Sequence, residues 1–180
     1  MLEAAGVAFT CDPARIDERA VEAGLGAADS AHAALALAEA KARDVARRNP
    51  GALVLGSDSL VVVSGQRFDK PAGCADAAAH LRRFSGKTME LHSAAALVRD
   101  SDTLWRHGAI ARLQVRSLSD QFIADYLAAE WPAVAACVGV FRIEGRGIQL
   151  FQSIAGDHFT VLGMPLLAVL GALRELGELA

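Results

Sequence analysis

Asp58 is the acidic residue whose surroundings point most clearly to chemistry. It follows the apolar run Ala52–Leu55 and lies in the break Gly56-Ser57-Asp58-Ser59. A buried carboxylate without partners is costly, so this side chain has to reach a cleft, a cation or several hydrogen-bond donors. Open α/β sheets bind ligands at the ends of buried strands, which makes Asp58 a candidate for a ligand site. A turn aspartate bonded to its own backbone is the commoner alternative for this spacing.

Two lysines could supply the positive charge that such a site needs. Lys70 precedes Pro71, and the residue before a proline is pushed out of the helical region, so the segment is expected to be extended. A lysine held there can clamp a phosphate as a point charge. Lys41 lies in a predicted helix beside Glu39. Taken singly, each lysine also fits an ordinary solvent-exposed position.

Glu144 is a second acidic candidate, placed between two apolar runs. Gly145 and Gly147 beside it would let a ligand or another backbone approach closely. A polar hairpin loop explains the same residues equally well. No GxxxxGK[ST] phosphate loop, GxGxxG turn, HExxH pair or GxSxG elbow occurs in the chain, so these candidates have to be judged together.

Alternating helices and strands must position these residues. Helices are expected over residues 29–48, 75–84, 119–128 and 165–177, and strands over residues 52–55, 60–63, 89–98, 104–115, 138–143 and 148–154. Asp29 and Ser30 offer N-cap oxygens to the first helix, and Asn49-Pro50-Gly51 ends it. Long paired strands occur among the helices, so the pattern predicts an α/β protein with a mixed sheet.

The composition excludes several classes of protein. At 180 residues, 53% apolar and 22% charged with a net charge of −3, the chain fits about one folded domain. The 18 Lys and Arg residues do not outnumber the 21 Asp and Glu residues, which disfavours a nucleic-acid partner. No apolar run approaches the roughly 18–20 residues that span a bilayer, so no membrane partner is expected.

The cysteines and the absence of a signal peptide indicate a compartment. Cys11, Cys74 and Cys137 form no CxxC pair and are odd in number. We expect free, mostly buried thiols in a reducing cytoplasm. Met1 to Thr10 lacks the basic start and continuous apolar stretch of a signal peptide.

Seven short segments, each weak alone, occur in a specific order and spacing. They are Ile16-Asp17-Glu18, Leu37 to Ala42, Gly56 to Val62, Asp69-Lys70-Pro71, Leu81 to Gly86, Tyr126 to Glu130, and Gly163 to Leu166. Together they resemble the Maf family of nucleoside triphosphate pyrophosphatases, over essentially residues 1–176. The resemblance implies one Maf-like domain over residues 1–180, with an inosine-triphosphatase-like twisted, mixed sheet, flanking helices and two lobes around a cleft.

The resemblance also implies an activity and roles for the candidates. Family members hydrolyse a nucleoside triphosphate between the α and β phosphates, giving a monophosphate and pyrophosphate with a divalent metal, Mg²⁺ or Mn²⁺. By resemblance, Asp58 is the proton acceptor that activates water, and Lys41 and Lys70 bind the phosphates. Glu18 and Asp58 would hold the metal, since Mg²⁺ typically takes only one or two carboxylates and keeps several waters.

Two positions are similar to the branch of the family that acts on 7-methyl-GTP. Many members carry Gln-Gly where this chain has Glu144-Gly145, and Thr where it has Ser59. Methylation at N7 makes the guanine ring cationic, so a carboxylate can attract that charge and accept from its N–H edge. We therefore expect Ser59 and Glu144 to set the base preference.

The beginning of the chain departs from the family pattern. The family opens with a β-strand and a Ser-x-Ser-Pro-x-Arg-Arg loop that grips phosphate, whereas this chain begins at Met1-Leu2-Glu3. Two interpretations are open: the start of the chain is placed too late, or this is an N-terminally truncated form that lacks the phosphate-binding loop and its bidentate arginine donors.

Alternative functions follow from the same residues. A dTTP/UTP pyrophosphatase is the alternative within the enzyme class, and Glu144 in place of Gln argues against it. A weakly active nucleotide-binding regulator of cell division is favoured by the missing loop and opposed by Glu18, Asp58 and Lys70. A structural domain without a ligand fits least. The partners expected are a nucleoside triphosphate and, by analogy with the family, a second copy in a homodimer.

Overall fold

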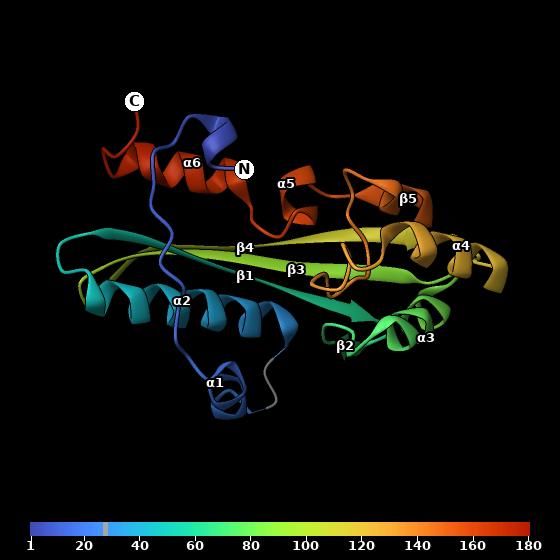
Figure 1. Ribbon diagram of the computed structural model, residues 1–180. Helices are drawn as coiled ribbons and strands as arrows, with labels where there is room; N and C mark the ends of the chain where they lie inside the picture. Colours follow the sequence, from blue (N-terminus) through green and yellow to red (C-terminus); the bar gives the residue numbers. More distant parts are fainter. Residues whose placement is uncertain (27–28) are drawn as a thin grey trace. The chain divides into compact units, whose positions relative to one another are not determined.

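One five-stranded sheet, in the order β2-β1-β3-β4-β5, organises the protein (Figure 1). The computed structural model describes residues 1–26 and 29–180. In chain order the elements are η1 (Glu3–Ala5), α1 (Glu18–Gly24), α2 (Ser30–Arg48), β1 (Leu53–Val63), β2 (Gln66–Phe68), α3 (Cys74–Phe84), β3 (Thr88–Arg99), β4 (Asp102–Val115), α4 (Asp120–Glu130), η2 (Arg146–Leu150), β5 (Phe151–Ala155), α5 (His158–Val161) and α6 (Leu166–Glu175).

The strand pairs at both edges of the sheet are antiparallel. Val61 pairs with Phe68 between β1 and β2, and Leu113 pairs with Ile154 between β4 and β5. The adjacent strands β3 and β4 are joined by a tight turn at Asp100, which only an antiparallel pair allows. The α/β class with helices flanking a sheet is confirmed. A mixed sheet was expected, whereas these three pairings are antiparallel.

Helix α2 forms where its capping residue predicts. The side chain of Asp29 accepts a hydrogen bond from the backbone N–H of His32, which satisfies one of the free donors at the helix start. Its buried face consists of small and aliphatic residues, namely Ala33, Ala34, Leu37, Ala38, Ala42, Val45 and Ala46. Ala42 and Ala46 pack with Val98 of β3 and Val54 of β1, so α2 covers one face of these strands (Figure 1).

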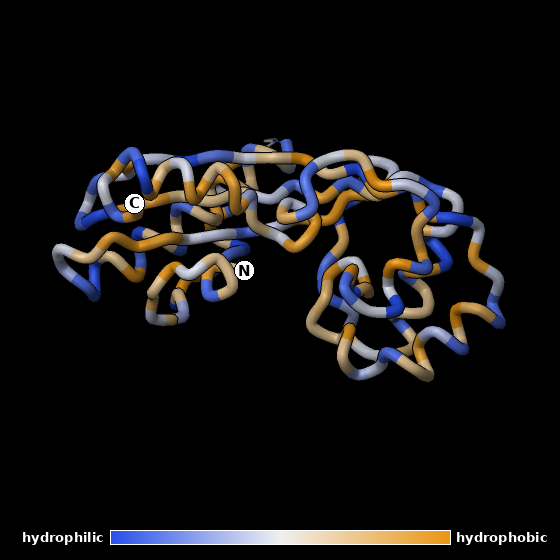
Figure 2. Tube along the Cα trace, turned by 90° about the horizontal axis from the view of Figure 1, so that it is seen from above, coloured by the Kyte–Doolittle hydropathy of each residue, from blue (hydrophilic) through white to orange (hydrophobic). Residues whose placement is uncertain are grey.

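Helix α6 covers the opposite face of the same strands. Pro165 occupies the position before its first residue, and Val169, Ala172 and Leu173 pack with Ala95 of β3. In Figure 2 apolar stretches recur along the trace and alternate with polar ones, as expected when helices and strands each bury one face. None of the helices in the described part of the chain is long and apolar enough to cross a bilayer.

The predicted interruption between residues 55 and 60 is wrong, because β1 runs unbroken from Leu53 to Val63. The polar residues in its middle all have partners. Asp58 binds Lys41 of α2, and Ser57 and Ser59 hydrogen-bond to groups on the other face. A polar run breaks a strand when its side chains bond to their own or neighbouring backbone groups, whereas here their partners lie in other segments.

The strand expected over residues 138–143 is absent, and the one expected over residues 148–154 begins only at Phe151. Val140 has a φ of 56°, a left-handed conformation that no strand accommodates. The phenol of Tyr126 donates to the carbonyl of Val140 at 2.9 Å, which fastens this loop to α4. A Cβ at Gly147 would lie 2.5 Å from the carbonyl oxygen of Arg142, so the loop folds tightly onto itself.

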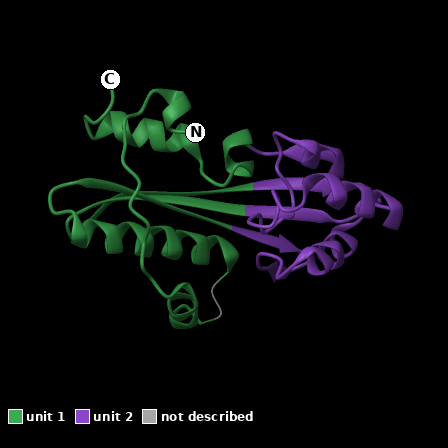
Figure 3. Cartoon of the chain, viewed as in Figure 1, with its two compact units in different colours: residues 1–59, 92–110, 157–180 green, residues 60–91, 111–156 purple. Residues whose placement is uncertain are grey.

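The chain divides into two compact units (Figure 3). Unit 1 contains Met1–Ser59, His92–Ile110 and Asp157–Ala180, and unit 2 contains Leu60–Leu91 and Ala111–Gly156. The core of unit 1 is formed by β1, β3, α2 and α6. In unit 2, Phe68 packs edge-on against Phe84 and His80 of α3. Two compact units agree with the expectation of two lobes, and the predicted cleft stays a prediction.

Candidate functional site

Lys41 lies between two carboxylates in unit 1. Its Nζ is 2.6 Å from Oδ1 of Asp58 and 2.8 Å from Oε1 of Glu18. The three residues come from three elements, α2, β1 and α1. Their side chains range from 9% exposed for Asp58 through 23% for Lys41 to 50% for Glu18. The cluster therefore joins the buried middle of a strand to the protein surface.

Close packing of β1 on α2 brings Asp58 to Lys41. Gly56 faces α2 two residues before Asp58, and a Cβ there would lie 2.2 Å from the carbonyl oxygen of Ala38. Successive strand residues alternate between the faces, so Asp58 points toward the same helix. Lys41 extends from the helix next to the buried Ala42. Only a glycine at position 56 permits this approach.

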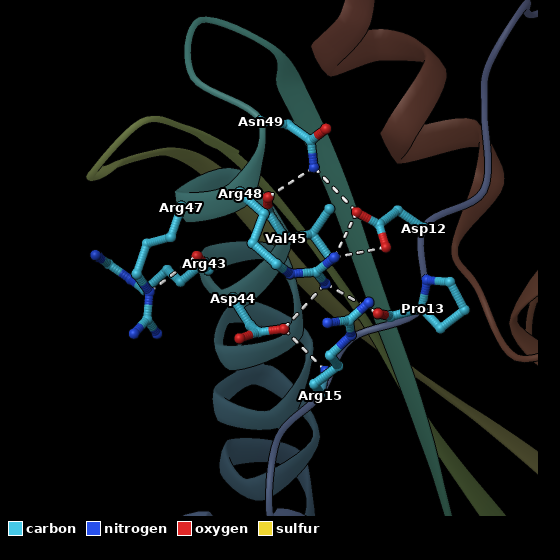
Figure 4. Close-up of polar contacts among 9 residues, drawn as sticks. All are labelled: Asp12, Pro13, Arg15, Arg43, Asp44, Val45, Arg47, Arg48 and Asn49. Atoms are coloured by element: carbon cyan, nitrogen blue, oxygen red, sulfur yellow. Dashed lines mark hydrogen bonds and ion pairs between the residues drawn. The ribbon is translucent and has the colours of Figure 1, made fainter.

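Hydrogen bonds between α2 and the segment before Glu18, residues 12–15, hold Glu18 near the cluster (Figure 4). Arg48 donates to both carboxylate oxygens of Asp12, at 2.7 and 2.6 Å, and the backbone N–H of Arg15 donates to Asp44 at 2.8 Å. The guanidinium of Arg48 lowers the pKa of Asp12. The backbone N–H of Arg15 is the main group that lowers the pKa of Asp44.

The side chain of Asp17 then caps α1 by accepting from the backbone N–H of Ala20, which makes Glu18 the first residue of that helix. Helix α1 packs against α2. The hydrogen bonds of residues 12–15 and the capping of α1 together position the Glu18 carboxylate next to Lys41.

The two carboxylates keep Lys41 charged. Burial favours the neutral amine, but hydrogen bonds to Asp58 and Glu18 outweigh it and raise the pKa of Lys41. The ammonium is therefore protonated at neutral pH. An ammonium has three donors and no acceptor, so Lys41 can serve both carboxylates at once.

The same donor set fits a divalent metal. One oxygen of Asp58 and one of Glu18 contact a single nitrogen, so both are within reach of one cation. Carboxylate oxygens are the ligands that Mg²⁺ prefers, and it usually keeps several waters. Over residues 1–26 and 29–180 no group of three or more His, Cys, Asp or Glu residues is arranged to hold a metal. The residues present fit a hydrated cation completed by substrate oxygens, not a closed protein cage.

Ser59 lies on the other face of β1, away from the Lys41 cluster. Its hydroxyl is 2.8 Å from that of Ser93 on β3. Ser57, on the same face, lies within hydrogen-bond distance of the carbonyls of Ala94 and Gly163, at 3.0 and 3.2 Å. The expected role of Ser59 in base preference therefore belongs to a surface distinct from the one that carries Asp58.

Lys70 and Glu144 belong to unit 2, and both side chains are exposed. The charges of both residues shift the pKa of the same thiol, that of Cys137. Burial is the main cause that raises the pKa of Cys137; Glu144 raises it further, and Arg142 and Lys70 lower it. The structure thus groups the predicted residues in two sets, Glu18, Lys41 and Asp58 in unit 1, and Lys70 and Glu144 in unit 2.

An ion pair between the buried Glu130 and the exposed Arg142, next to Glu144, was not predicted from the sequence. Nη2 of Arg142 donates to Oε2 of Glu130 at 2.9 Å, and Glu130 is only 6% exposed. This hydrogen bond is the main cause that raises the pKa of Arg142. Tyr126 and Glu130 are four residues apart on α4, so one face of that helix binds the loop at both Val140 and Arg142. That i, i+4 spacing was the available signal.

The structure adds one residue that the sequence did not indicate and corrects one expectation. Ser93 is 1% exposed within β3, and its need for a hydrogen-bond partner was the signal that could have found it. The thiols are free as expected, but Cys11 and Cys74 are exposed and Cys137 is half-buried, so the expectation of mostly buried thiols is wrong. Cys11 precedes the segment of residues 12–15 that binds α2, and Cys74 is the first residue of α3. Neither side chain is part of the core.

Comparison with known proteins identifies the family of the chain. A protein from Rhizobium etli named 7-methyl-GTP pyrophosphatase is 48% identical over 181 residues, covering 99% of this chain and 91% of its own length. Its namesake from Rhizobium meliloti is also 48% identical with the same coverage. A protein from Nitrobacter winogradskyi named nucleoside triphosphate pyrophosphatase is 46% identical over 175 residues, covering 97% of this chain and 87% of its own. The model of the Maf-like protein family matches residues 1–176, and the chain belongs to this family.

Proposed function

We propose that this protein is a nucleoside triphosphate pyrophosphatase whose preferred substrate is 7-methyl-GTP, which it converts to the monophosphate and pyrophosphate. The observation that carries the proposal is the cluster of Asp58, Lys41 and Glu18, in which a largely buried carboxylate is held by a cation beside a second, exposed carboxylate. The names of the relatives from Rhizobium and Nitrobacter support the same reaction.

Asp58 is the group suited to activate water. Its carboxylate contacts the protonated Lys41, so it is held as an anion that can accept a proton. Water adds to the α-phosphorus, its proton passes to Asp58, the bond to the β-phosphate oxygen breaks, and pyrophosphate leaves. Lys41 orients both carboxylates and supplies positive charge next to the phosphates. Lys70, an exposed cation of unit 2, is proposed as a further phosphate ligand.

A divalent cation, Mg²⁺ or Mn²⁺, would be held by Asp58 and Glu18. When bound, it would neutralise charge on the phosphate oxygens. Glu18 is suited to this role because half of its side chain is exposed, so that waters and substrate oxygens can complete the ligand set.

Base preference is assigned to Glu144 and Ser59. The exposed carboxylate of Glu144 can attract the cationic 7-methylguanine ring, whereas a neutral glutamine would lack the charge. Hydrogen bonds of Tyr126 and Glu130 to the loop hold the segment that carries Glu144. Action on dTTP and UTP is the alternative within the same reaction, and weakly active nucleotide binding in cell division is the alternative outside it.

The reducing cytoplasm and a homodimer complete the proposal. Free thiols at Cys11, Cys74 and Cys137 fit a reducing compartment. Light scattering on the purified protein tests the dimer, because the mass in solution would be about twice the 18.9 kDa of one chain.

Pyrophosphate release tests the function directly. The protein is assayed with 7-methyl-GTP, GTP, dTTP and UTP in the presence of Mg²⁺ or Mn²⁺. We expect the highest kcat/KM for 7-methyl-GTP and a loss of about 100-fold or more in Asp58→Asn. Asp102→Asn, which removes an exposed carboxylate at the start of β4, serves as the control and should retain activity. Equal activity of Asp58→Asn and the parent protein would exclude Asp58 as the base.

A further inference from the structure

A chain of hydrogen bonds runs inward from Ser59 on the face of β1 opposite Asp58. The hydroxyls of Ser59 and Ser93 are 2.8 Å apart, and the Ser93 hydroxyl donates to the backbone carbonyl of Thr160 at 2.8 Å. Thr160 is itself held in place, because its N–H and its hydroxyl both donate to Oδ2 of Asp157, at 2.8 and 3.0 Å. All four residues belong to unit 1.

Elementary donor and acceptor chemistry fixes the direction of this chain. A carbonyl can only accept, so the single proton of Ser93 is committed to Thr160. Between Ser59 and Ser93 the donor must then be Ser59. Because a serine hydroxyl has one proton and two lone pairs, Ser59 has no proton left to donate. Toward a ligand it can therefore act only as an acceptor.

Burial keeps the direction from reversing. Ser93 is 1% exposed and Thr160 is fully buried, so neither can exchange its partner for water. Ser59 is partly exposed, and its hydroxyl makes no other hydrogen bond within residues 1–26 and 29–180, which leaves its acceptor available. A ligand that approaches β1 on this face meets a hydroxyl oxygen that can only accept a hydrogen bond, because its buried neighbours fix the direction of its proton.

We propose that Ser93 is a positioning residue that fixes Ser59 as an obligate acceptor, so that Ser59 selects an N–H donor on the substrate base. This inference rests on the proposed function and adds the group that is recognised. Guanine presents two such donors on one edge, its ring N1–H and its 2-amino group, next to one acceptor. Ser59 would then favour bases with a donor edge, and Ser93 would be needed for that preference although it never touches the substrate.

Nucleotide binding tests the inference independently of turnover. Calorimetry in an Asp58→Asn background, where the proposed base is missing, compares 7-methyl-GTP with 7-methyl-ITP, which lacks the 2-amino group, and with 1,7-dimethyl-GTP, which lacks N1–H. We expect the Asp58→Asn protein to bind one of these analogues about tenfold more weakly than 7-methyl-GTP. Adding Ser59→Ala should abolish that difference.

Ser93 is tested by loss and rescue. Ser93→Ala should reduce the preference for the donor-bearing base several-fold, and Ser93→Thr, which keeps a hydroxyl, should restore it. Ser153→Ala, at an exposed position of β5, is the matched control and should change nothing. A purely structural role of Ser93 would lower the unfolding temperature of Ser93→Ala but leave the ratio of dissociation constants unchanged.

The outcomes separate this inference from the proposed function. An unchanged ratio in both Ser59→Ala and Ser93→Ala overturns the inference, as does a parent protein that binds all three nucleotides equally. Absence of pyrophosphate release from every triphosphate, with the binding preference intact, overturns the proposed function alone.

Discussion

At the scale of single residues, the site depends on one ammonium that serves two carboxylates. Without Lys41, a carboxylate that is 9% exposed would lie near a second one with no cation between them. Like charges so close disfavour ionisation of one partner, and a protonated Asp58 cannot accept a proton from water. Lys41 therefore matters for the protonation state of Asp58 as well as for binding phosphate.

Replacement of the ammonium by an apolar group tests this dual role. We expect Lys41→Met to lower kcat/KM for pyrophosphate release about 100-fold or more and to shift the activity profile toward higher pH, because Asp58 would ionise less readily. Steady-state kinetics from pH 5 to 9 provide the measurement. Lys87→Met, at an exposed lysine between α3 and β3, is the control. An unshifted profile would mean that Lys41 does not act on Asp58.

Glu144 carries the charge argument for the methylated base. Between exposed groups a single charge pair contributes about 1 kcal/mol in water, so Glu144→Gln should reduce the preference for 7-methyl-GTP over GTP about fivefold. The ratio of kcat/KM for the two nucleotides is the measurement, and added salt should reduce it in the parent protein as well. Glu175→Gln, at the exposed end of α6, controls for a loss of surface charge. The same ratio in Glu144→Gln and the parent protein would refute the assignment.

The sequence identifies these residues better than it identifies their partners. Asp58, Lys41 and Glu18 could be singled out because each lies in a short segment of recognisable type. The bonds that join them could not, since they connect α1, α2 and β1 across long stretches of chain. Ser93 and Glu130 escaped for the same reason, because each works through a partner that only the folded chain brings near.

At the scale of elements, the contact of α2 with β1 sets the position of the site. A Cβ at Gly56 would lie 2.7 Å from the backbone nitrogen of Ala42 as well as 2.2 Å from the carbonyl oxygen of Ala38. These are backbone atoms of a helix, which cannot move aside singly. Any side chain at this position must push the helix and the strand apart, and Lys41 would move with the helix.

Gly56→Ala tests the consequence of that contact. Overpacking typically costs about 1–3 kcal/mol, so the free energy of unfolding should fall by that amount and pyrophosphate release should fall with it. Urea unfolding gives the stability. Gly171→Ala is the matched control, because a Cβ there meets nothing within 4 Å and an alanine favours α6 by about 0.5–1 kcal/mol. Equal stability of Gly56→Ala and the parent protein would show that the helix can yield.

Local signals explain which elements could be predicted. Asp29 and Ser119 cap α2 and α4 as their residue types indicate, and both helices begin where expected. The predicted break in β1 failed because serine and aspartate are turn residues only when nothing else binds them. The apolar run after Cys137 predicts a strand, yet the phenol of Tyr126 and the buried carboxylate of Glu130, both on α4, hold it as a loop.

At the scale of the whole molecule, polar networks on α2 include partners that are distant in sequence. Arg48 binds Asp12 and Asp44, and Glu39 accepts from Arg43, Thr103 and Arg106. Burial works against ionisation of Glu39, but these hydrogen bonds outweigh it and lower its pKa below the ordinary 4.5. Asp12 and Asp44 are lowered below 3.8. A carboxylate with a lowered pKa in the folded state adds stability above its unfolded value and loses it as the pH falls through the folded value.

Stability should therefore decline on the acid side. We expect the unfolding temperature to fall steadily once the pH drops below about 4.5, and Arg48→Met to make that decline shallower, because Asp12 and Asp44 then have less to lose. Thermal unfolding followed by circular dichroism from pH 2 to 7 is the measurement, with Arg83→Met, an exposed arginine on α3, as the control. An identical acid slope in Arg48→Met would exclude the pairs of Arg48 with Asp12 and Asp44 as the cause.

The positions of the thiols have a practical consequence. Cys11 is exposed in unit 1 and Cys74 is exposed in unit 2, whereas Cys137 is half-buried with a pKa raised mainly by burial. A thiol with a raised pKa reacts slowly with maleimides, so fluorophores should attach to the other two first. Energy transfer between such a dye pair would report how far apart the units stay when a nucleotide is added, without any engineered attachment point.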